Sequence, residues 1–155
     1  MSTHPFQQDS TERGADGSLT RADFSTFWPV PTRWADNDQY GHVNNAVYYQ
    51  YFDTAVNGWL SRALGRPVDE LPALGVVAET GCRYLRQASF PDLLEIGIAV
   101  TRLGRSSISY ELGVFSAGDA PHAVGRFIHV YVDRENRRPV TIPPEVATAA
   151  ALLAR

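Results

Sequence analysis

Residues 33–53, RWADNDQYGHVNNAVYYQYFD, carry side chains that could do chemistry. Asp36, Asp38 and His42 stand immediately before an apolar stretch with helical spacing. The start of a helix has free backbone N–H groups and partial positive charge, so it can polarise a carbonyl oxygen and stabilise an oxyanion. A carboxylate on the preceding loop can attack the carbonyl carbon or activate a water. Hydrolysis of an ester or thioester needs only these two functions, so we expect neither a metal site nor a cofactor.

Residues 45–64 form the clearest predicted helix. Apolar residues recur there in adjacent pairs every four residues, which makes one wide apolar stripe. Asn44 is a good N-cap, and Gly65 is a suitable C-terminal stop. A stripe this wide predicts a helix that is largely enclosed by the rest of the fold. The stripe comprises Val47, Tyr48, Tyr51, Phe52, Ala55, Val56, Trp59 and Leu60.

Several segments alternate apolar and polar residues and predict an antiparallel sheet of about five strands. Pro29 and Pro31 interrupt the first strand and place it at an edge. One long helix against one curved sheet is a compact α+β fold. Such a sheet leaves its edges unpaired, and pairing of two edges into a dimer would resolve this. The predicted strands are residues 24–34, 74–85, 94–100, 108–114 and 124–132, followed by a short helix at 145–153.

Composition limits the protein classes. The chain has 155 residues, and we expect a polar leader at residues 1–23 and one domain at residues 24–155. A net charge of −3 gives no field that attracts nucleic acid, and no apolar run is long enough for a membrane span. Cys82 is the only cysteine, and the N-terminus lacks the pattern of a signal peptide. A cytoplasmic protein that binds neither nucleic acid nor membrane is the prediction.

Residues 36–48 fit the pattern D-x-D-x-x-G-H-V-N-N-x-x-Y, which resembles the signature of hot-dog-fold acyl-CoA thioesterases of the 4-hydroxybenzoyl-CoA thioesterase type. Residues 84–96, YLRQASFPDLLEI, and residues 101–110, TRLGRSSISY, resemble later parts of the same family. The resemblance covers roughly residues 24–145. It implies one long central helix wrapped by a curved antiparallel sheet of about five strands, assembled as a homodimer or a homotetramer.

The resemblance also implies roles for single residues. Asp38 matches the catalytic carboxylate, as nucleophile or as general base. Asn45 matches the position whose backbone N–H polarises the thioester carbonyl. His42 lies in the H-V-N-N motif that is shared with acyl-carrier-protein thioesterases, where the histidine is implicated in the active site as a neighbour of the same aspartate. The alternative for His42 is a buried, hydrogen-bonded histidine that positions the loop. Those enzymes tend to have a polar residue at the position of Tyr40, so this departure favours a simpler site of an aspartate and a helix start.

Substrate contacts are predicted at two places. Tyr40, Asn44 and Tyr48 belong to the motif or to the first turns of the helix, where an acyl pocket would lie. Arg105 and Ser106 match a hairpin that lies close to the path of CoA in the family. Every cation of this chain is an arginine, whose planar fork suits phosphate. Solvated charge on an outward strand face is the competing interpretation for any single arginine. The candidate phosphate anchors, which fall in or beside strands, are Arg83, Arg86, Arg102, Arg105 and Arg126.

Other candidate residues have simpler interpretations. Asp36 is expected to bond to backbone groups and fix the loop. Asp53 lies among aromatic residues of the helix, where we expect its side chain to bond across to the sheet. Glu79 is a further candidate carboxylate on the second strand. Cys82 is expected to act as a small apolar residue, since no histidine or asparagine is spaced to activate it.

The function predicted from these patterns is hydrolysis of an acyl-CoA to a free acid and CoA, with CoA as part of the substrate. Two alternatives remain open. One is a non-catalytic hot-dog module that binds or senses acyl-CoA, because this fold can bind without cleaving. The other is a thioesterase that acts on acyl carrier protein. The identity of the acyl group depends on packing that no periodicity reveals.

Overall fold

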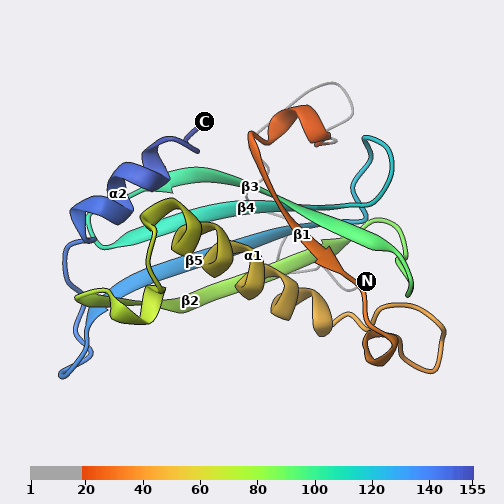
Figure 1. The fold of residues 1–155 in the computed structure, drawn as a ribbon, viewed down its shortest axis with the longest axis horizontal. Helices are drawn as coiled ribbons and strands as arrows, with labels where there is room; N and C mark the ends of the chain where they lie inside the picture. The colour runs from red at the N-terminus through yellow and green to blue at the C-terminus, as the bar shows by residue number, and fades with distance from the viewer. Residues whose placement is uncertain (1–18) are drawn as a thin grey trace, which may run out of the picture.

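A computed structural model describes residues 19–155, which form one five-stranded antiparallel sheet with a long helix across it (Figure 1). The strand order in the sheet is β1-β3-β4-β5-β2. The α+β arrangement predicted from the sequence is therefore confirmed. The elements are β1 (Thr26–Pro31), α1 (Val47–Leu64), β2 (Ala73–Tyr84), β3 (Leu93–Leu103), β4 (Ser107–Phe115), β5 (Ala123–Asp133) and α2 (Pro144–Ala151).

Helix α1 lies close to the sheet because glycines leave room for aromatic rings. A Cβ at Gly125 in β5 would come within 2.4 Å of the ring of Phe52, so only glycine lets this ring approach the strand so closely. In the same way, a Cβ at Gly58 of α1 would come within 2.5 Å of the Trp28 ring from β1. The helix ends at Gly65, whose φ of 67° is the left-handed conformation that glycine adopts without strain.

The N-terminus of α1 differs in detail from the prediction. The helix begins at Val47, two residues later than the sequence pattern suggested, with Ala46 as the capping position. The Asn44 side chain does accept a backbone hydrogen bond, but from the Ala46 N–H at 2.9 Å rather than from the first helical turn. Residues 44–46 therefore form a turn that precedes the helix. The Asn44 side chain competes for this local amide, which is the usual behaviour of asparagine near helix ends.

The two edges of the sheet are β1 and β2. Strand β1 carries Pro29 and Pro31, which confirms the prediction that the prolines place it at an edge. Strand β2 pairs only with β5, and residues 75–80 are exposed. Neither α1 nor α2 of residues 19–155 has the length and apolarity that a membrane crossing requires.

Most of the predicted leader, residues 1–18, lies outside the described residues. Residues 19–23 belong to the folded part, because Arg21–Asp23 forms a 3-10 turn against the sheet. The Arg21 guanidinium lies over the rings of Phe27 and Phe115 at 5.3 and 5.1 Å. Polarity in the sequence could not reveal this anchor, because it depends on contacts with strands far along the chain.

Candidate active site

The loop ahead of α1 is anchored by Asp36. This carboxylate is 1% exposed. Its Oδ2 accepts from the Arg33 N–H at 2.8 Å and from the Tyr51 hydroxyl at 2.7 Å, while its Oδ1 accepts from the Arg33 guanidinium at 2.7 Å. The Asp36 carbonyl also accepts from the Asn44 N–H at 2.9 Å, which closes the loop. These bonds agree with the prediction that Asp36 bonds to backbone groups and fixes the loop.

The charge of Asp36 is stabilised by these partners. Burial alone would raise the pKa of the carboxyl, but the bonds from the side chain and backbone of Arg33 and from Tyr51 outweigh it and lower the pKa. Burial and the neighbouring carboxylate together raise the pKa of the Tyr51 hydroxyl, so it stays a donor. Tyr51 ties the loop to the buried face of α1.

Asp38 lies two residues further on, half-buried on a tight turn. Its Oδ1 accepts from the Tyr40 N–H at 2.8 Å, and its own N–H donates to the His42 carbonyl at 2.9 Å. The turn passes through Gly41 at φ 80°, a conformation that favours glycine. The Asn44 side chain approaches Oδ2 at 3.5 Å, which is too long for a strong hydrogen bond. Oδ1 of Asp38 therefore accepts a short hydrogen bond, whereas Oδ2 is only weakly engaged by a long contact.

Asp38 and Asn45 line the same open pocket, whose volume is about 360 Å³. Among residues 19–155, the Ala46 N–H donates to the Asn44 side chain, whereas the Asn45 N–H has no hydrogen-bond acceptor. The residue that carries the loop carboxylate and a residue of the turn ahead of α1 thus line one cavity. The complete lining is Asp38, Tyr40, His42, Val43, Asn45, Tyr48, Tyr84, Leu85, Arg86 and Gln87.

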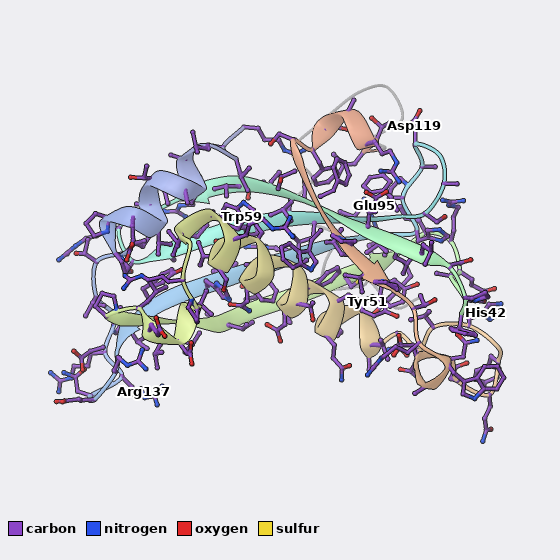
Figure 2. All side chains as sticks on the ribbon, in the orientation of Figure 1. His42, Tyr51, Trp59, Glu95, Asp119 and Arg137 are labelled. Atoms are coloured by element: carbon purple, nitrogen blue, oxygen red, sulfur yellow. The ribbon has the colours of Figure 1, made fainter. Side chains whose placement is uncertain are left out.

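The structure brings most of the predicted site residues together. Tyr40, His42 and Tyr48 all line this pocket. Tyr40 is 85% exposed, whereas Tyr48 is only 2% exposed. The Nδ1 atom of His42 is buried and has no hydrogen-bond partner within the described part of the chain. Figure 2 labels His42 beyond Tyr51, at the end of the molecule where α1 starts, and Trp59 towards the other end. Asn44 does not line the pocket, but its side chain contacts Asp38.

Arg105 and Ser106 are not brought to this pocket within one chain. They lie in the turn between β3 and β4, at the opposite end of the sheet (Figure 1). Their carbonyls accept from the Ile142 N–H at 2.9 Å and from the Tyr131 N–H at 2.7 Å. A hairpin can be recognised from the sequence, but which end of the sheet it occupies relative to the loop depends on the register of all the strands.

The sequence did not identify the wall of the pocket formed by residues 84–87. The Tyr84 hydroxyl donates to the Asn45 carbonyl at 2.7 Å, and its ring meets the Tyr48 ring edge-on with centroids 5.1 Å apart. Burial raises the pKa of Tyr84, so this hydroxyl remains protonated. Residues 84–96 resemble the family and Arg86 was a candidate phosphate anchor, but neither signal placed this stretch beside the loop of Asp38.

The other candidate side chains have different surroundings. Glu79 pairs with Arg126 at 3.4 Å on the outer face of the sheet. The Asp53 side chain is exposed and makes no hydrogen bond within residues 19–155, so the expected bond to the sheet is wrong; α1 turns this position away from the strands. Burial raises the pKa of the Cys82 thiol to about 11, which keeps it protonated and unreactive. No group of three metal-ligating side chains occurs in residues 19–155.

A long helix on a curved five-stranded antiparallel sheet is the arrangement of the hot-dog fold, and the pocket lined by Asp38 lies ahead of this helix. The sequence profile of the thioesterase-like superfamily matches residues 32–150. The chain therefore belongs to this superfamily, as the D-x-D-x-x-G-H-V-N-N pattern predicted.

The chain is also similar to solved structures and to a curated relative. The PA5185 protein from Pseudomonas aeruginosa strain PAO1 is 43% identical with a TM-score of 0.85, and the match covers 88% of this chain and 96% of that chain. A thioesterase complexed with coenzyme A and Zn from Thermus thermophilus is 30% identical with a TM-score of 0.72, covering 84% and 95%. The YsmA protein of Bacillus subtilis strain 168 is 29% identical over 122 residues, which cover 78% of this chain and 82% of YsmA.

Proposed function

We propose that this protein is an acyl-CoA thioesterase, which hydrolyses a thioester to a free acid and CoA. One observation carries the proposal: Asp38 and Asn45 line the same pocket, and Asn45 lies in the turn directly ahead of α1. The Asn45 N–H donates to the thioester oxygen, and the partial positive charge of the helix start stabilises the negative charge that develops there. Thioesters suit such a site, because a thiolate leaves readily without a strong acid.

The weakly engaged Oδ2 of Asp38 can act in either of two ways. As a nucleophile, it forms a bond to the carbonyl carbon, the C–S bond breaks, CoA thiolate leaves, and water then hydrolyses the acyl-aspartyl anhydride. As a general base, it takes a proton from a water whose oxygen attacks the carbon, and the tetrahedral intermediate expels the thiolate. In both routes His42 orients Asp38 through the bond from the Asp38 N–H to the His42 carbonyl.

The pocket also offers a cation for the CoA arm. Arg86 lines it and is exposed; because its Nη2 donates to the Ala120 carbonyl at 2.6 Å, a phosphate would be held by the positive charge and by the remaining N–H groups of the guanidinium. The similar thioesterase from Thermus thermophilus, which was solved with coenzyme A, supports CoA as the carrier. Tyr40 and Tyr48 supply apolar surface for the acyl side of the substrate.

We propose further that β2 pairs with β2 of a second copy. The strand runs for 12 residues, contains neither proline nor lysine, and exposes Val76 and Val77 by 36% and 43%. Pairing about a two-fold axis runs the two β2 strands antiparallel. Ser107 pairs with Val130, which pairs with Val76, so the Arg105–Ser106 turn lies at the N-terminal end of β2. That end then approaches the partner's pocket, which is how Arg105 and Ser106 would reach CoA.

The oligomeric state can be measured directly. Light scattering on the purified protein should give the mass of a dimer, or of a tetramer if two dimers associate. The Val77→Arg variant should shift the mass towards the monomer, because it places a charge in the shared edge. A wild-type protein that is monomeric at micromolar concentration would contradict edge pairing.

The decisive test of the activity is release of free thiol. The wild-type protein should release CoA thiol from at least one member of a panel of short, long and aromatic acyl-CoAs, and the Asp38→Asn variant should not. Tight binding without thiol release would favour the alternative of a non-catalytic acyl-CoA-binding module. Faster release from acyl carrier protein than from every acyl-CoA would reassign the carrier.

Incorporation of ¹⁸O from labelled water into the Asp38 carboxylate is the signature of the nucleophilic route. With Asp38 as nucleophile, water attacks the anhydride, and turnover places ¹⁸O in the Asp38 carboxylate wherever attack occurs at the aspartyl carbon. With Asp38 as general base, the label appears only in the acid product. Mass spectrometry of the peptide that contains Asp38 reads the difference.

A further inference from the structure

The wall of the pocket is held from behind by His122. Its carbonyl accepts from two consecutive amides, the Leu85 N–H at 2.8 Å and the Arg86 N–H at 3.0 Å. Its ring Nδ1 lies 3.0 Å from the Gln87 carbonyl. Leu85, Arg86 and Gln87 all line the pocket, whereas His122 does not. One buried residue, 5% exposed, therefore fastens three successive residues of the wall.

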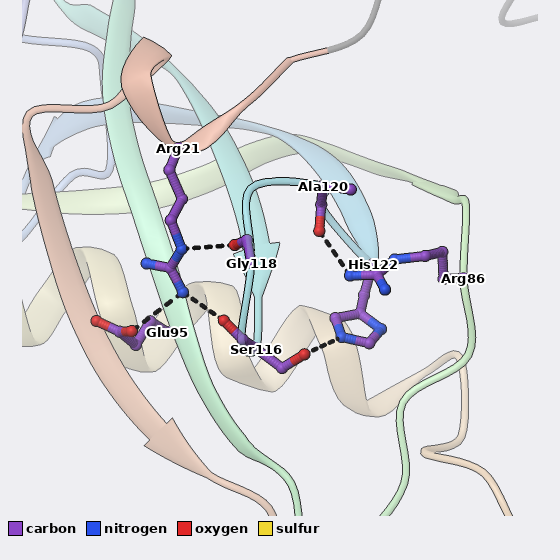
Figure 3. Close-up of polar contacts among 7 residues, drawn as sticks. All are labelled: Arg21, Arg86, Glu95, Ser116, Gly118, Ala120 and His122. Atoms are coloured by element: carbon purple, nitrogen blue, oxygen red, sulfur yellow. Dashed lines mark hydrogen bonds and ion pairs between the residues drawn. The ribbon is translucent and has the colours of Figure 1, made fainter.

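The partners of His122 determine its protonation. The Gln87 carbonyl can only accept, so Nδ1 carries the proton. In the neutral ring, Nε2 then accepts from the Ser116 hydroxyl at 2.7 Å (Figure 3). Burial and the nearby charge of Arg86 lower the pKa of His122, which favours this neutral tautomer at neutral pH.

Ser116 lies in the connection between β4 and β5, residues 116–122, and this connection is hydrogen-bonded by both Arg21 and Arg86. Arg21 donates to the Gly118 carbonyl at 2.8 Å and to the Ser116 carbonyl, and it pairs with Glu95 at 3.2 Å. Arg86 donates to the Ala120 carbonyl at 2.6 Å. Figure 3 shows these bonds converging on the hairpin around His122. His122 thus connects this fixed hairpin to the wall of the pocket.

The wall connects in turn to the loop of Asp38. The Ala88 carbonyl, directly after Gln87, accepts from the Val43 N–H at 2.8 Å. The neighbouring His42 carbonyl accepts from the Asp38 N–H at 2.9 Å. A continuous run of backbone hydrogen bonds therefore joins the back of the wall to the carboxylate, the kind of physical network through which position can be transmitted.

We propose that His122 is a positioning residue for the thioesterase reaction: its Nδ1–H bond to the Gln87 carbonyl holds the pocket wall and, through Ala88 and Val43, the Asp38 loop. This inference rests on the proposed function. Neither Ser116 nor His122 lines the pocket, so the pair does not act as a nucleophile and its base there. Misplacement of a reacting group by about 1 Å can cost up to about 100-fold in rate, so a support of this kind affects turnover.

Two matched variants separate the two ring nitrogens. In His122→Asn the amide nitrogen occupies the place of Nδ1 and can donate to the Gln87 carbonyl. In His122→Gln the amide is one bond longer, occupies the place of Nε2 and reaches Ser116 instead. Per folded protein, we expect kcat/KM of the asparagine variant within about threefold of wild type and that of the glutamine variant lowered about tenfold or more, mainly in kcat. Equal activity of the two variants, or a better glutamine variant, would overturn the proposal.

Nuclear magnetic resonance gives a readout that does not depend on turnover. The imidazole ¹⁵N shifts of the wild-type protein should report the Nδ1–H tautomer of His122 at pH 7, and the Nε2–H tautomer would overturn the assignment. Hydrogen exchange of the Val43 amide should be faster in the glutamine variant than in the asparagine variant, and equal rates would also overturn it. If no acyl-CoA or acyl carrier protein is hydrolysed, the proposed function fails, and these exchange rates still decide whether His122 positions the loop.

Discussion

Asp36 and Asp38 stand two residues apart on one loop and have opposite surroundings. Asp36 is buried, with both carboxylate oxygens bonded to Arg33 or Tyr51. Asp38 lines an open pocket, with one oxygen held by the Tyr40 amide and the other only weakly engaged. The first carboxylate has its hydrogen-bonding capacity satisfied within the protein. The second retains capacity for a substrate or a water.

The comparison indicates that the position of the Asp38 carboxylate depends on the hydrogen bonds that Asp36 makes. Asp36 ties the loop to Arg33 and to Tyr51 on α1, and its carbonyl accepts from Asn44. These bonds bring the chain back to the start of the helix, where Asp38 and Asn45 can face the same cavity. We therefore expect substitutions at Asp38 to affect turnover and substitutions around Asp36 to affect stability first.

The largest effect is expected at Asp38. The Asp38→Asn variant should lose about 100- to 1,000-fold in kcat, because an amide can neither attack the thioester nor accept a proton from water. Its free energy of unfolding should stay within about 0.5 kcal/mol of wild type, since the residue is half-buried and lightly bonded. Thiol-release kinetics and urea denaturation measure the two quantities. If Asp38→Asn loses as much stability as a substitution of Asp36, the expected difference between the two carboxylates is contradicted.

Asp36→Ala should give the reverse pattern. It leaves the Tyr51 hydroxyl without its partner and opens the loop, which should lower the free energy of unfolding by about 2–3 kcal/mol. Urea denaturation measures the loss. Turnover per folded molecule should fall less than in Asp38→Asn. A variant as stable as wild type would show that the loop does not need this anchor.

The dependence of stability on pH sharpens the contrast. The pKa of Asp36 is lowered in the folded protein from its usual 3.8, so its charged form stabilises the fold above about pH 4. That contribution is lost as the pH falls through the lowered pKa. The stability difference between wild type and Asp36→Asn should therefore shrink between about pH 5 and pH 2, as measured by urea denaturation at each pH. A constant difference across this range would contradict the assignment.

The smallest effect is expected at Tyr51. Tyr51→Phe removes the 2.7 Å hydrogen bond to Asp36 but keeps the ring in the core, and it should cost about 1–1.5 kcal/mol of stability. Turnover should stay within about threefold of wild type. Tyr48→Phe, on the same helix but lining the pocket, is the matched control for loss of a buried hydroxyl. If Tyr51→Phe lowers kcat as much as Asp38→Asn does, the hydroxyl acts in the chemistry and the two regions are not separable.

Much of the fold could be predicted because its elements have strong local patterns. The paired apolar residues of α1 and the alternation in β3 and β4 can be read within short windows, and Gly65 and the prolines of β1 mark ends and edges. The start of α1 was placed two residues early, because Asn44 bonds to the Ala46 amide before the helix begins. The fixed place of Arg21 was missed, because its hydrogen-bond and ion-pair partners lie 74 to 97 residues further along the chain.

The candidate site also has one part that the sequence could predict and another that it could not. The sequence alone determined the loop, its two aspartates and their place before a helix, since these residues are neighbours along the chain. Tertiary structure decided which aspartate is buried, which end of the sheet closes the pocket, and that Gln87 meets His122, 35 residues away. Strand register sets such contacts, and a shift by one residue would turn every side chain of a strand to the other face. No pattern within a short window contains that information.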